Sequence, residues 1–410
     1  MILKRSPLAP PSFPDLPTVR GIRIGGVSAG LKRADKRDLL IAEMRPSATI
    51  AGKFTSSKCP SAPVDWCRKA LKGGKARVII ANSGNANAFT GSSGNRTVQE
   101  VTTAAAKEFQ CRNNEIFVAS TGVIGQQLDP IPICRCLDGA AKTLSPGNWL
   151  EAADAIRTTD TFPKGAMRIA DIGGEKIQIV GIAKGSGMIA PDMATMLGFI
   201  FTDAKMPASI LQKLLDHSTE RSFNSITVDS DMSTSDTVLL VASGSVKHPR
   251  ITSAKDPKLI RFRQALTEVM VDLATQIVRD GEGARKFITI DISGATSAQS
   301  AKRIGLAIAN SPLVKTALAG EDANWGRIVM AVGKAGERAN RDKLSISIGG
   351  IPITSDGQVI NDYDEQPVAE HLKKSEVVLA VDVGIGRGKA RVWTCDLTHD
   401  YISINADYRS

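Results

Sequence analysis

Two stretches of this chain alternate apolar and polar residues on either side of a Gly-Gly pair, and this pattern constrains the fold more than any other feature. The first, MRIADIGGEKIQIVGIA, covers residues 167–183, and the second, LSISIGGIPIT, covers residues 344–354. A period of two residues is typical of β-strands, and central glycines are typical of the tight turn of a hairpin. Both stretches are therefore predicted to be β-hairpins, which implies antiparallel sheet.

A long amphipathic helix and a strand follow one another in the second half of the chain. Asp256-Pro257 opens the helix, its apolar residues fall at three- and four-residue steps until Ile277, and Gly281 ends it. The next apolar stretch, KFITIDIS, places its isoleucines on one face of a strand. Glu282 lies on the glycine-flanked turn between the two elements, as either a working carboxylate or an ordinary solvated loop residue.

Helices and strands mix along the whole chain without repeats or long linkers, which predicts an α/β or α+β fold. The 410 residues allow two or three domains, and 42% hydrophobic with 23% charged residues is typical of globular proteins. The proline-rich opening MILKRSPLAPPSFPDLP lacks the apolar core of a signal peptide, and no stretch approaches about eighteen consecutive apolar residues. We therefore expect a cytoplasmic protein that does not span a membrane.

The formal net charge of +10 comes from Lys and Arg residues spread over the whole length, and aromatic residues make up only 4%. A nucleic-acid-binding protein would concentrate both on one surface, so no such partner is expected, and an anionic small substrate or a plain solvated surface explains the charge as well. The six cysteines and four histidines match no metal-ligand spacing. Reduced thiols and no metal centre are therefore expected.

Three common catalytic and cofactor motifs are missing from the sequence. GIGRGKA, residues 384–390, has neither the glycine spacing of a P-loop nor the Ser or Thr that should follow its lysine. GSSG, residues 91–94, is one residue out from a G-x-S-x-G serine elbow. Val278, before DGEGA, stands where a coenzyme A loop would need Gln or Arg. The remaining route to a nucleophile is a threonine.

Thr195 lies in KGSGMIAPDMATMLGFIFTDA, residues 184–204. If the Ala194-Thr195 bond broke, the hydroxyl would gain the α-amine of Thr195 as a base. The pKa of such an α-amine is about 8. The hydroxyl would first attack the preceding carbonyl, which moves the chain from nitrogen to oxygen before water releases it. This shift needs a bent peptide and a small preceding residue, and Ala194 follows two glycines and a proline. The same pattern is also that of a packed threonine in a buried strand.

Eight motifs in order make the chain resemble the ornithine acetyltransferase family, the bifunctional glutamate N-acetyltransferases of arginine biosynthesis. They are ANSGNANAFTG (81–91), STGVIG (120–125), TTDTFPK (158–164), KGSGMIAPDMATMLGFIFTDA (184–204), SFNSITVDSDMSTSDT (222–237), DGEGARK (280–286), EDANWGRI (321–328) and the terminal INADYRS. The resemblance covers essentially the whole chain.

The resemblance implies that the chain cleaves itself between Ala194 and Thr195, which gives an α chain of residues 1–194 and a β chain of residues 195–410. Thr195 would then take acetyl from N-acetylornithine as an ester, release ornithine, and pass the acetyl group to glutamate in a ping-pong cycle. The partners would therefore be amino-acid substrates.

The resemblance also implies which residues build the site. The Thr121 hydroxyl and the Gly122 N–H would stabilise the tetrahedral oxyanion. Lys184 would meet a substrate carboxylate, and Glu282 would meet an ammonium group or assist proton transfer near the Thr195 amine. The substrate contacts carried over are Thr158, Lys184, Thr195, Glu282, Asn405 and Ser410.

The implied fold is a layered sandwich of mixed and antiparallel sheets flanked by helices, of the self-cleaving N-terminal-threonine-nucleophile type. A smaller α/β region would follow from about residue 245, and two α and two β chains would assemble. No metal or resident cofactor is implied, and family members differ in whether acetyl-coenzyme A also donates acetyl. Family chains often end in threonine; Ser410 departs from this but keeps a hydroxyl and the terminal carboxylate.

Two other functions stay open at this point. A self-processed N-terminal-nucleophile amidase or aminopeptidase would form the same acyl-Thr195 intermediate and resolve it with water. A basic binding protein without catalysis would show no self-cleavage and would bind nucleic acid in a salt-sensitive manner.

Overall fold

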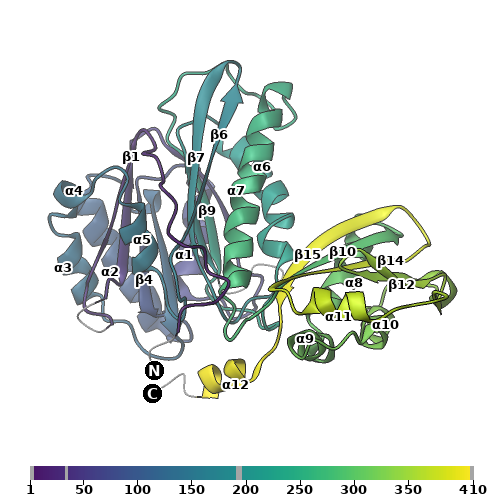
Figure 1. The fold of residues 1–410 in the computed structure, drawn as a ribbon. Helices are drawn as coiled ribbons and strands as arrows, with labels where there is room; N and C mark the ends of the chain where they lie inside the picture. The colour runs from purple at the N-terminus through teal and green to yellow at the C-terminus, as the bar shows by residue number, and fades with distance from the viewer. Residues whose placement is uncertain (1–3, 33–35, 191–195, 407–410) are drawn as a thin grey trace.

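The computed structural model describes residues 4–32, 36–190 and 196–406, and consists of two packed sheets with helices against them and a third sheet later in the chain (Figure 1). The described residues form a layered arrangement of mixed sheets and helices, which confirms the predicted α/β (α+β) class. Ala194, Thr195 and Ser410, which carry much of the predicted chemistry, lie outside the described residues.

The first sheet has the strand order β1-β2-β4-β5. Its strands are β1 (Ile22–Val27), β2 (Leu39–Met44), β4 (Val78–Asn85) and β5 (Ile116–Val123). β4 and β5 are parallel, whereas the other neighbours are antiparallel. The helices around this sheet are α1 (Ala62–Ala70), α2 (Gly91–Glu108), α3 (Ile131–Leu137), α4 (Ala140–Thr143) and α5 (Trp149–Ala155).

The second sheet has the strand order β3-β9-β8-β7-β6. Its strands are β3 (Thr49–Phe54), β6 (Lys164–Ile172), β7 (Glu175–Lys184), β8 (Leu197–Thr202) and β9 (Thr237–Ala242). β6 and β7 form the first predicted hairpin, which is thereby confirmed. Both residues of its turn, Gly173 and Gly174, have positive φ, a conformation that glycine adopts without strain. Helix α6 (Ala208–Glu220) packs against β3.

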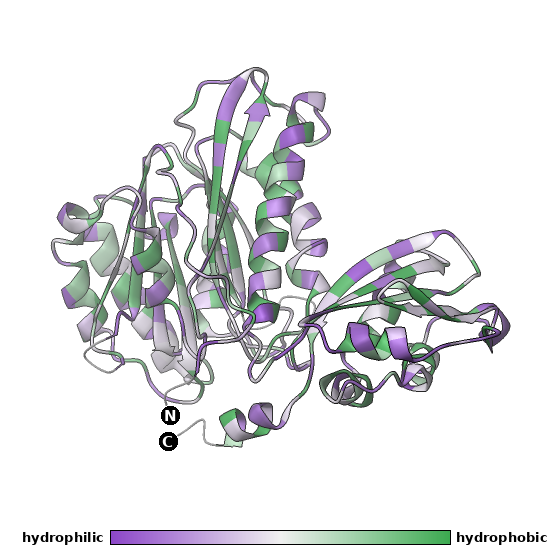
Figure 2. Cartoon of the chain, viewed as in Figure 1, coloured by the Kyte–Doolittle hydropathy of each residue, from purple (hydrophilic) through white to green (hydrophobic). Residues whose placement is uncertain are grey.

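Strand β8 is buried on both faces and is accordingly apolar up to its last residue, Thr202. Phe199 and Phe201 pack into a core shared with the first sheet, whereas Ile200 packs into a second core with α6 and the long helix that follows. Trp149 of α5 joins the first core, with its ring centroid 5.5 Å from that of Phe201. The strands inside the sandwich are accordingly hydrophobic in Figure 2, while helix surfaces carry hydrophilic residues.

The third sheet has the strand order β13-β12-β11-β14-β10-β15. Its strands are β10 (Phe287–Ala295), β11 (Ser345–Ile348), β12 (Ile351–Ser355), β13 (Gln358–Val359), β14 (Glu376–Asp382) and β15 (Gly388–Cys395). The second predicted hairpin is confirmed as β11 and β12, which are antiparallel neighbours. The helices of this part of the chain are α8 (Ala298–Ala309), α9 (Pro312–Ala319), α10 (Trp325–Gly333), α11 (Gln366–Leu372) and α12 (His399–Ala406).

Helix α7 (Ile260–Arg279) is the predicted long helix, and it lies along β6 and β7 of the second sheet (Figure 1). The side chain of Asp256 accepts a hydrogen bond from the Lys258 N–H at 3.0 Å and caps the 3₁₀ turn Pro257–Leu259, so the predicted cap lies one turn before α7 itself. Because α7 buries its apolar face on the second sheet, the third sheet begins only at Phe287.

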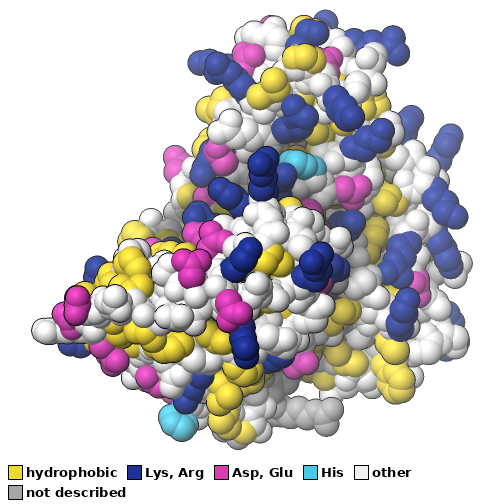
Figure 3. Space-filling model, turned by 90° about the vertical axis from the view of Figure 1, so that its right-hand side faces the viewer, with side chains coloured by type: hydrophobic (Ala, Val, Ile, Leu, Met, Phe, Trp, Pro, Cys, Tyr) yellow, Lys and Arg dark blue, Asp and Glu magenta, His cyan; other side chains and the backbone are white. Residues whose placement is uncertain are grey.

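Lys and Arg side chains are scattered over the face shown in Figure 3, with Asp and Glu among them. In the described part of the chain, every helix is too short or too polar to cross a bilayer. The same residues contain no group of three His, Cys, Asp or Glu side chains that could hold a metal ion.

The packing of the sandwich predicts different costs for two phenylalanines. Phe201 is fully buried, whereas Phe89 is 89% exposed. Phe201→Ala is expected to lower the free energy of unfolding by about 3–5 kcal/mol, because it removes buried surface and leaves a cavity. Phe89→Ala should change it by less than about 0.5 kcal/mol. Denaturant titration of both variants measures the difference, and equal losses would contradict the assignment of the core.

Candidate active site

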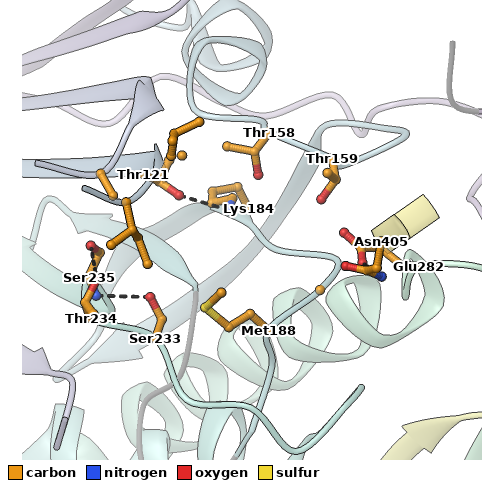
Figure 4. Close-up of a pocket in the computed structure, with 15 residues that line it drawn as sticks. Thr121, Thr158, Thr159, Lys184, Met188, Ser233, Thr234, Ser235, Glu282 and Asn405 are labelled. Carbon is orange, nitrogen blue, oxygen red and sulfur yellow. Dashed lines mark hydrogen bonds between the residues drawn. The ribbon is translucent and has the colours of Figure 1, made fainter. Parts of the chain in front are cut away.

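A cavity of about 260 Å³ lies where the ends of β5 and β7 meet the turn after α7 and helix α12 (Figure 4). The structure brings six predicted site residues together in its wall: Thr121, Gly122, Thr158, Lys184, Glu282 and Asn405. Their positions span most of the chain, so the fold gathers side chains that the sequence separates. The other predicted residues, Ala194, Thr195 and Ser410, lie outside the described residues.

Lys184 ends β7 and is only 2% exposed. Its Nζ donates a hydrogen bond to Thr121 Oγ1 at 3.2 Å, which joins the second sheet to the first. Burial lowers the pKa of Lys184, while the nearby Asp160 carboxylate acts in the opposite direction. Among the described residues no carboxylate forms an ion pair with Lys184, so the ammonium has donors left for an anionic ligand.

Gly122 follows Thr121 near the end of β5, beside Gly84 of β4. Its φ is +132°, and a Cβ at this position would lie 2.3 Å from the carbonyl carbon of Gly84. A larger residue would therefore push the two parallel strands apart. The glycine keeps the backbone of Thr121 and Gly122 at the cavity wall.

Glu282 lies on the turn between α7 and β10 and is 8% exposed, so it is not the solvated loop residue of the alternative reading. Its backbone N–H donates to the Ser186 carbonyl at 3.0 Å, and Asn405 Nδ2 donates to its Oε2 at 2.8 Å. A Cβ on Gly187 would lie 2.4 Å from the same Oε2. The carboxylate thus fits into the cavity wall only because residue 187 is glycine.

Asp229 holds the loop that follows β7, which includes Met188 and Ile189. Its two carboxylate oxygens accept the N–H groups of Met188 at 2.6 Å and Ile189 at 2.9 Å. Met188 has a φ of +56°, an uncommon conformation for a residue other than glycine, and these bonds hold it there. The Tyr401 hydroxyl of α12 donates to the same carboxylate at 3.3 Å. The helix that carries Asn405 is thereby tied to the loop after β7.

Several hydroxyl side chains of the cavity were missed by sequence reasoning. Thr159 has its Oγ1 2.6 Å from Ser186 Oγ, and Ser233, Thr234 and Ser235 line the cavity far from Glu282 and Asn405 (Figure 4). They occur in the hydroxyl-rich motifs TTDTFPK and SFNSITVDSDMSTSDT. Because Ser and Thr are equally common in ordinary polar loops, no spacing separates these residues from the rest of each motif.

Asp236 follows this hydroxyl-rich run and is completely buried. Its Oδ1 accepts the N–H of Met196 at 2.7 Å, and burial raises its pKa well above the usual range. The carboxyl group thereby anchors the start of β8, directly after the predicted nucleophile in the sequence.

A buried ammonium, a carboxylate, an amide and several hydroxyls therefore surround one small cavity. An ammonium can bind a carboxylate, and a carboxylate can bind an ammonium. The arrangement suits a small zwitterionic ligand, and the glycine-bounded backbone at Gly122 can approach a reacting group closely.

Comparison with known proteins gives matches along the whole chain. A family model described as the ArgJ family matches residues 23–410. The arginine biosynthesis bifunctional protein ArgJ of Zymomonas mobilis subsp. mobilis is 53% identical over 412 residues, which cover 100% of each chain. The protein of the same name from Bradyrhizobium diazoefficiens is 53% identical over 408 residues, which cover 99% of each chain.

A crystal structure of the arginine biosynthesis bifunctional protein from Bacillus halodurans is also similar. It is 40% identical and covers 51% of this chain and 97% of its own, with a TM-score of 0.49. The resemblance drawn from the eight motifs is confirmed by the family model and the full-length relatives. This chain belongs to the ArgJ family.

Proposed function

We propose that this chain transfers the acetyl group of N-acetylornithine to glutamate through an acetyl-Thr195 intermediate, which yields ornithine and N-acetylglutamate. The observation that carries the proposal is the meeting of Lys184, Glu282 and Asn405 in one cavity, since these groups match the charges of an amino acid. The names of the relatives, which are bifunctional proteins of arginine biosynthesis, support the same pathway.

The proposed chemistry proceeds in two half-reactions. In the first, the free α-amine of Thr195 takes the hydroxyl proton as Oγ attacks the acetyl carbonyl of N-acetylornithine. The amide C–N bond breaks, ornithine leaves with the proton, and the acetyl group stays on Thr195 as an ester. In the second, the amine of glutamate attacks this ester, the C–O bond breaks, and the Thr195 hydroxyl regains its proton.

Thr121 and Gly122 are the proposed donors to the tetrahedral oxyanion of both half-reactions. The bond from Lys184 supports this role, because the Thr121 hydroxyl accepts it and keeps its own hydrogen to donate. A hydroxyl polarised by an ammonium is also a stronger donor. Loss of one oxyanion donor typically lowers kcat by about 10²–10³-fold.

Lys184 is proposed to bind the substrate carboxylate, and Glu282 to bind an ammonium group or to assist proton transfer at the Thr195 amine. Asn405 supports the proposed role of Glu282, because its Nδ2 donates to Glu282 Oε2 and holds the carboxylate in one orientation. Thr158 and Ser410 complete the proposed substrate contacts.

Maturation is proposed to start with self-cleavage between Ala194 and Thr195, which separates the α chain, residues 1–194, from the β chain, residues 195–410. Two α and two β chains are proposed to assemble and to work in the cytoplasm. We further propose acetyl-coenzyme A as a second acetyl donor, which would be a co-substrate and not a resident cofactor.

The acceptor separates this proposal from the amidase alternative. With N-acetylornithine and glutamate together, the protein should form ornithine and N-acetylglutamate in equal amounts. With N-acetylornithine alone, ornithine release should stop after one acetyl group per chain, because no acceptor removes the ester. Chromatographic quantification of both products measures this. Steady release of acetate that does not depend on glutamate would support the amidase and refute the transferase.

Replacement of Lys184 tests the carboxylate contact. Lys184→Met should raise KM for glutamate about 10- to 100-fold, because a hydrogen bond to a charged group contributes about 1.5–3 kcal/mol. Lys176→Met is the matched control, since Lys176 lies exposed at the other end of the same strand. Steady-state kinetics of both variants should show the rise in KM only for Lys184→Met. Equal kinetics in the two variants would remove Lys184 from the substrate site.

A further inference from the structure

Three charged side chains form a fully buried cluster, which we call the ion triad: Asp160, Lys164 and Asp280. Lys164 Nζ lies 2.7 Å from Asp160 Oδ1 and 2.6 Å from Asp280 Oδ2, and none of the three side chains is exposed. Such burial is costly unless every charge is paired and hydrogen-bonded. The triad meets that condition, and it lies next to the cavity without lining it.

Asp160 and Asp280 differ in the other hydrogen bonds that their carboxylates accept. Its Oδ1 accepts the N–H of Gly185 at 2.6 Å, and its Oδ2 accepts the N–H of Thr158 at 3.0 Å. One carboxylate thus fixes the backbone at Thr158 and directly after Lys184, which are two proposed substrate contacts. Asp280 instead accepts from the backbone N–H and the hydroxyl of Thr161, which does not line the cavity.

Asp160 forms its ion pair with Lys164, and among the described residues it forms none with Lys184. Burial opposes the charge of Asp160, but Lys164 and Lys184 outweigh it and lower its pKa, so Asp160 stays ionised. Asp160 in turn raises the pKa of Lys184, which burial lowers. The other charged groups that act on Lys184 are Lys164, Asp236, Glu282 and Lys32. The carboxylate near Lys184, that of Asp160, is thus already paired with Lys164. The ammonium group of Lys184 keeps its remaining N–H donors for the substrate.

We propose that Asp160 is a positioning residue for the transfer reaction, which holds Thr158 and Lys184 in register and is itself anchored by Lys164. Asp280 serves only as the second anchor of Lys164. This inference rests on the proposed function, because it assigns a role to residues next to the proposed substrate contacts.

Two isosteric substitutions separate positioning from stability. Asp160→Asn and Asp280→Asn each remove one buried partner of Lys164, so both should lower the midpoint of thermal unfolding. Only Asp160→Asn places an amide among three donors, the Lys164 ammonium and the Thr158 and Gly185 N–H groups. We expect kcat/KM for N-acetylornithine to fall about a hundredfold in Asp160→Asn, the scale of a misplaced contact, and less than about threefold in Asp280→Asn. Equal losses in both variants overturn the proposal.

The pH dependence of KM gives a readout that a merely structural role would not move. Lys184 must be protonated to bind the carboxylate of glutamate. KM for glutamate therefore rises as the pH increases through the pKa of Lys184. Asp160→Asn removes a group that raises this pKa, so the rise in KM should begin at lower pH than in the wild type. In Asp280→Asn the rise in KM should occur at the same pH as in the wild type. An unmoved profile in Asp160→Asn refutes the link to Lys184.

The double variant Lys164→Met/Asp280→Asn keeps the test decisive if Asp160→Asn fails to fold. It removes one cation with one anion and leaves Asp160 with both backbone contacts. Because Lys164 lowers the pKa of Lys184, its removal should move the rise in KM to higher pH, opposite to Asp160→Asn. A profile that does not move upward overturns the proposal. A wild type that forms no N-acetylglutamate refutes the proposed function instead, so the two failures are distinguishable.

Discussion

The hydrogen bond from Lys184 Nζ to Thr121 Oγ1 joins the two sheets of the sandwich at the point where β5 and β7 both end. A buried ammonium is costly in an apolar core, so its surroundings must supply acceptors or counter-charge. Thr121 supplies the acceptor, and Asp160 supplies the nearby negative charge. β7 is paired on both sides, with β6 and β8, so the ammonium is held on a rigid element. Lys184 thereby places a fixed ammonium group in the wall of the cavity.

The remaining parts of the site are held by the same kind of constraint, in which a polar group is fixed by backbone contacts. Asp229 holds the loop after β7, and the turn that carries Glu282 is bonded to Ser186 in that loop. A side chain at position 187 would force the Glu282 carboxylate out of its present position. The described part of the site is thus held by contacts within the protein itself, and fixed donors and charges of this kind can stabilise a transition state electrostatically.

The sequence predicted those parts of the fold that depend on local pattern. The two Gly-Gly hairpins and the helix from Asp256-Pro257 follow from periods of two and of three to four residues, and all three were found. The face that α7 covers could not be predicted, because an amphipathic helix does not reveal which sheet it packs on.

The residues of the site could likewise be predicted only in part. The family motifs led to Thr121, Thr158, Lys184, Glu282 and Asn405, which the fold brings together. The contacts between them join segments far apart in the chain, such as Glu282 and Asn405, 123 residues apart, and no local pattern encodes such pairs. The hydroxyl groups at Ser233 and Thr159 carry no distinctive spacing either.

The proposed chemistry requires that Thr195 becomes a new N-terminus and carries the acetyl group. The most direct test is the intact mass of the purified wild type and of Thr195→Ala, before and after exposure to N-acetylornithine without glutamate. The wild type should give two fragments that meet at Ala194-Thr195, with the second heavier by one acetyl group after exposure, whereas the variant should stay uncut and take up none. A single wild-type chain that stays uncut and unacetylated would contradict the proposed chemistry.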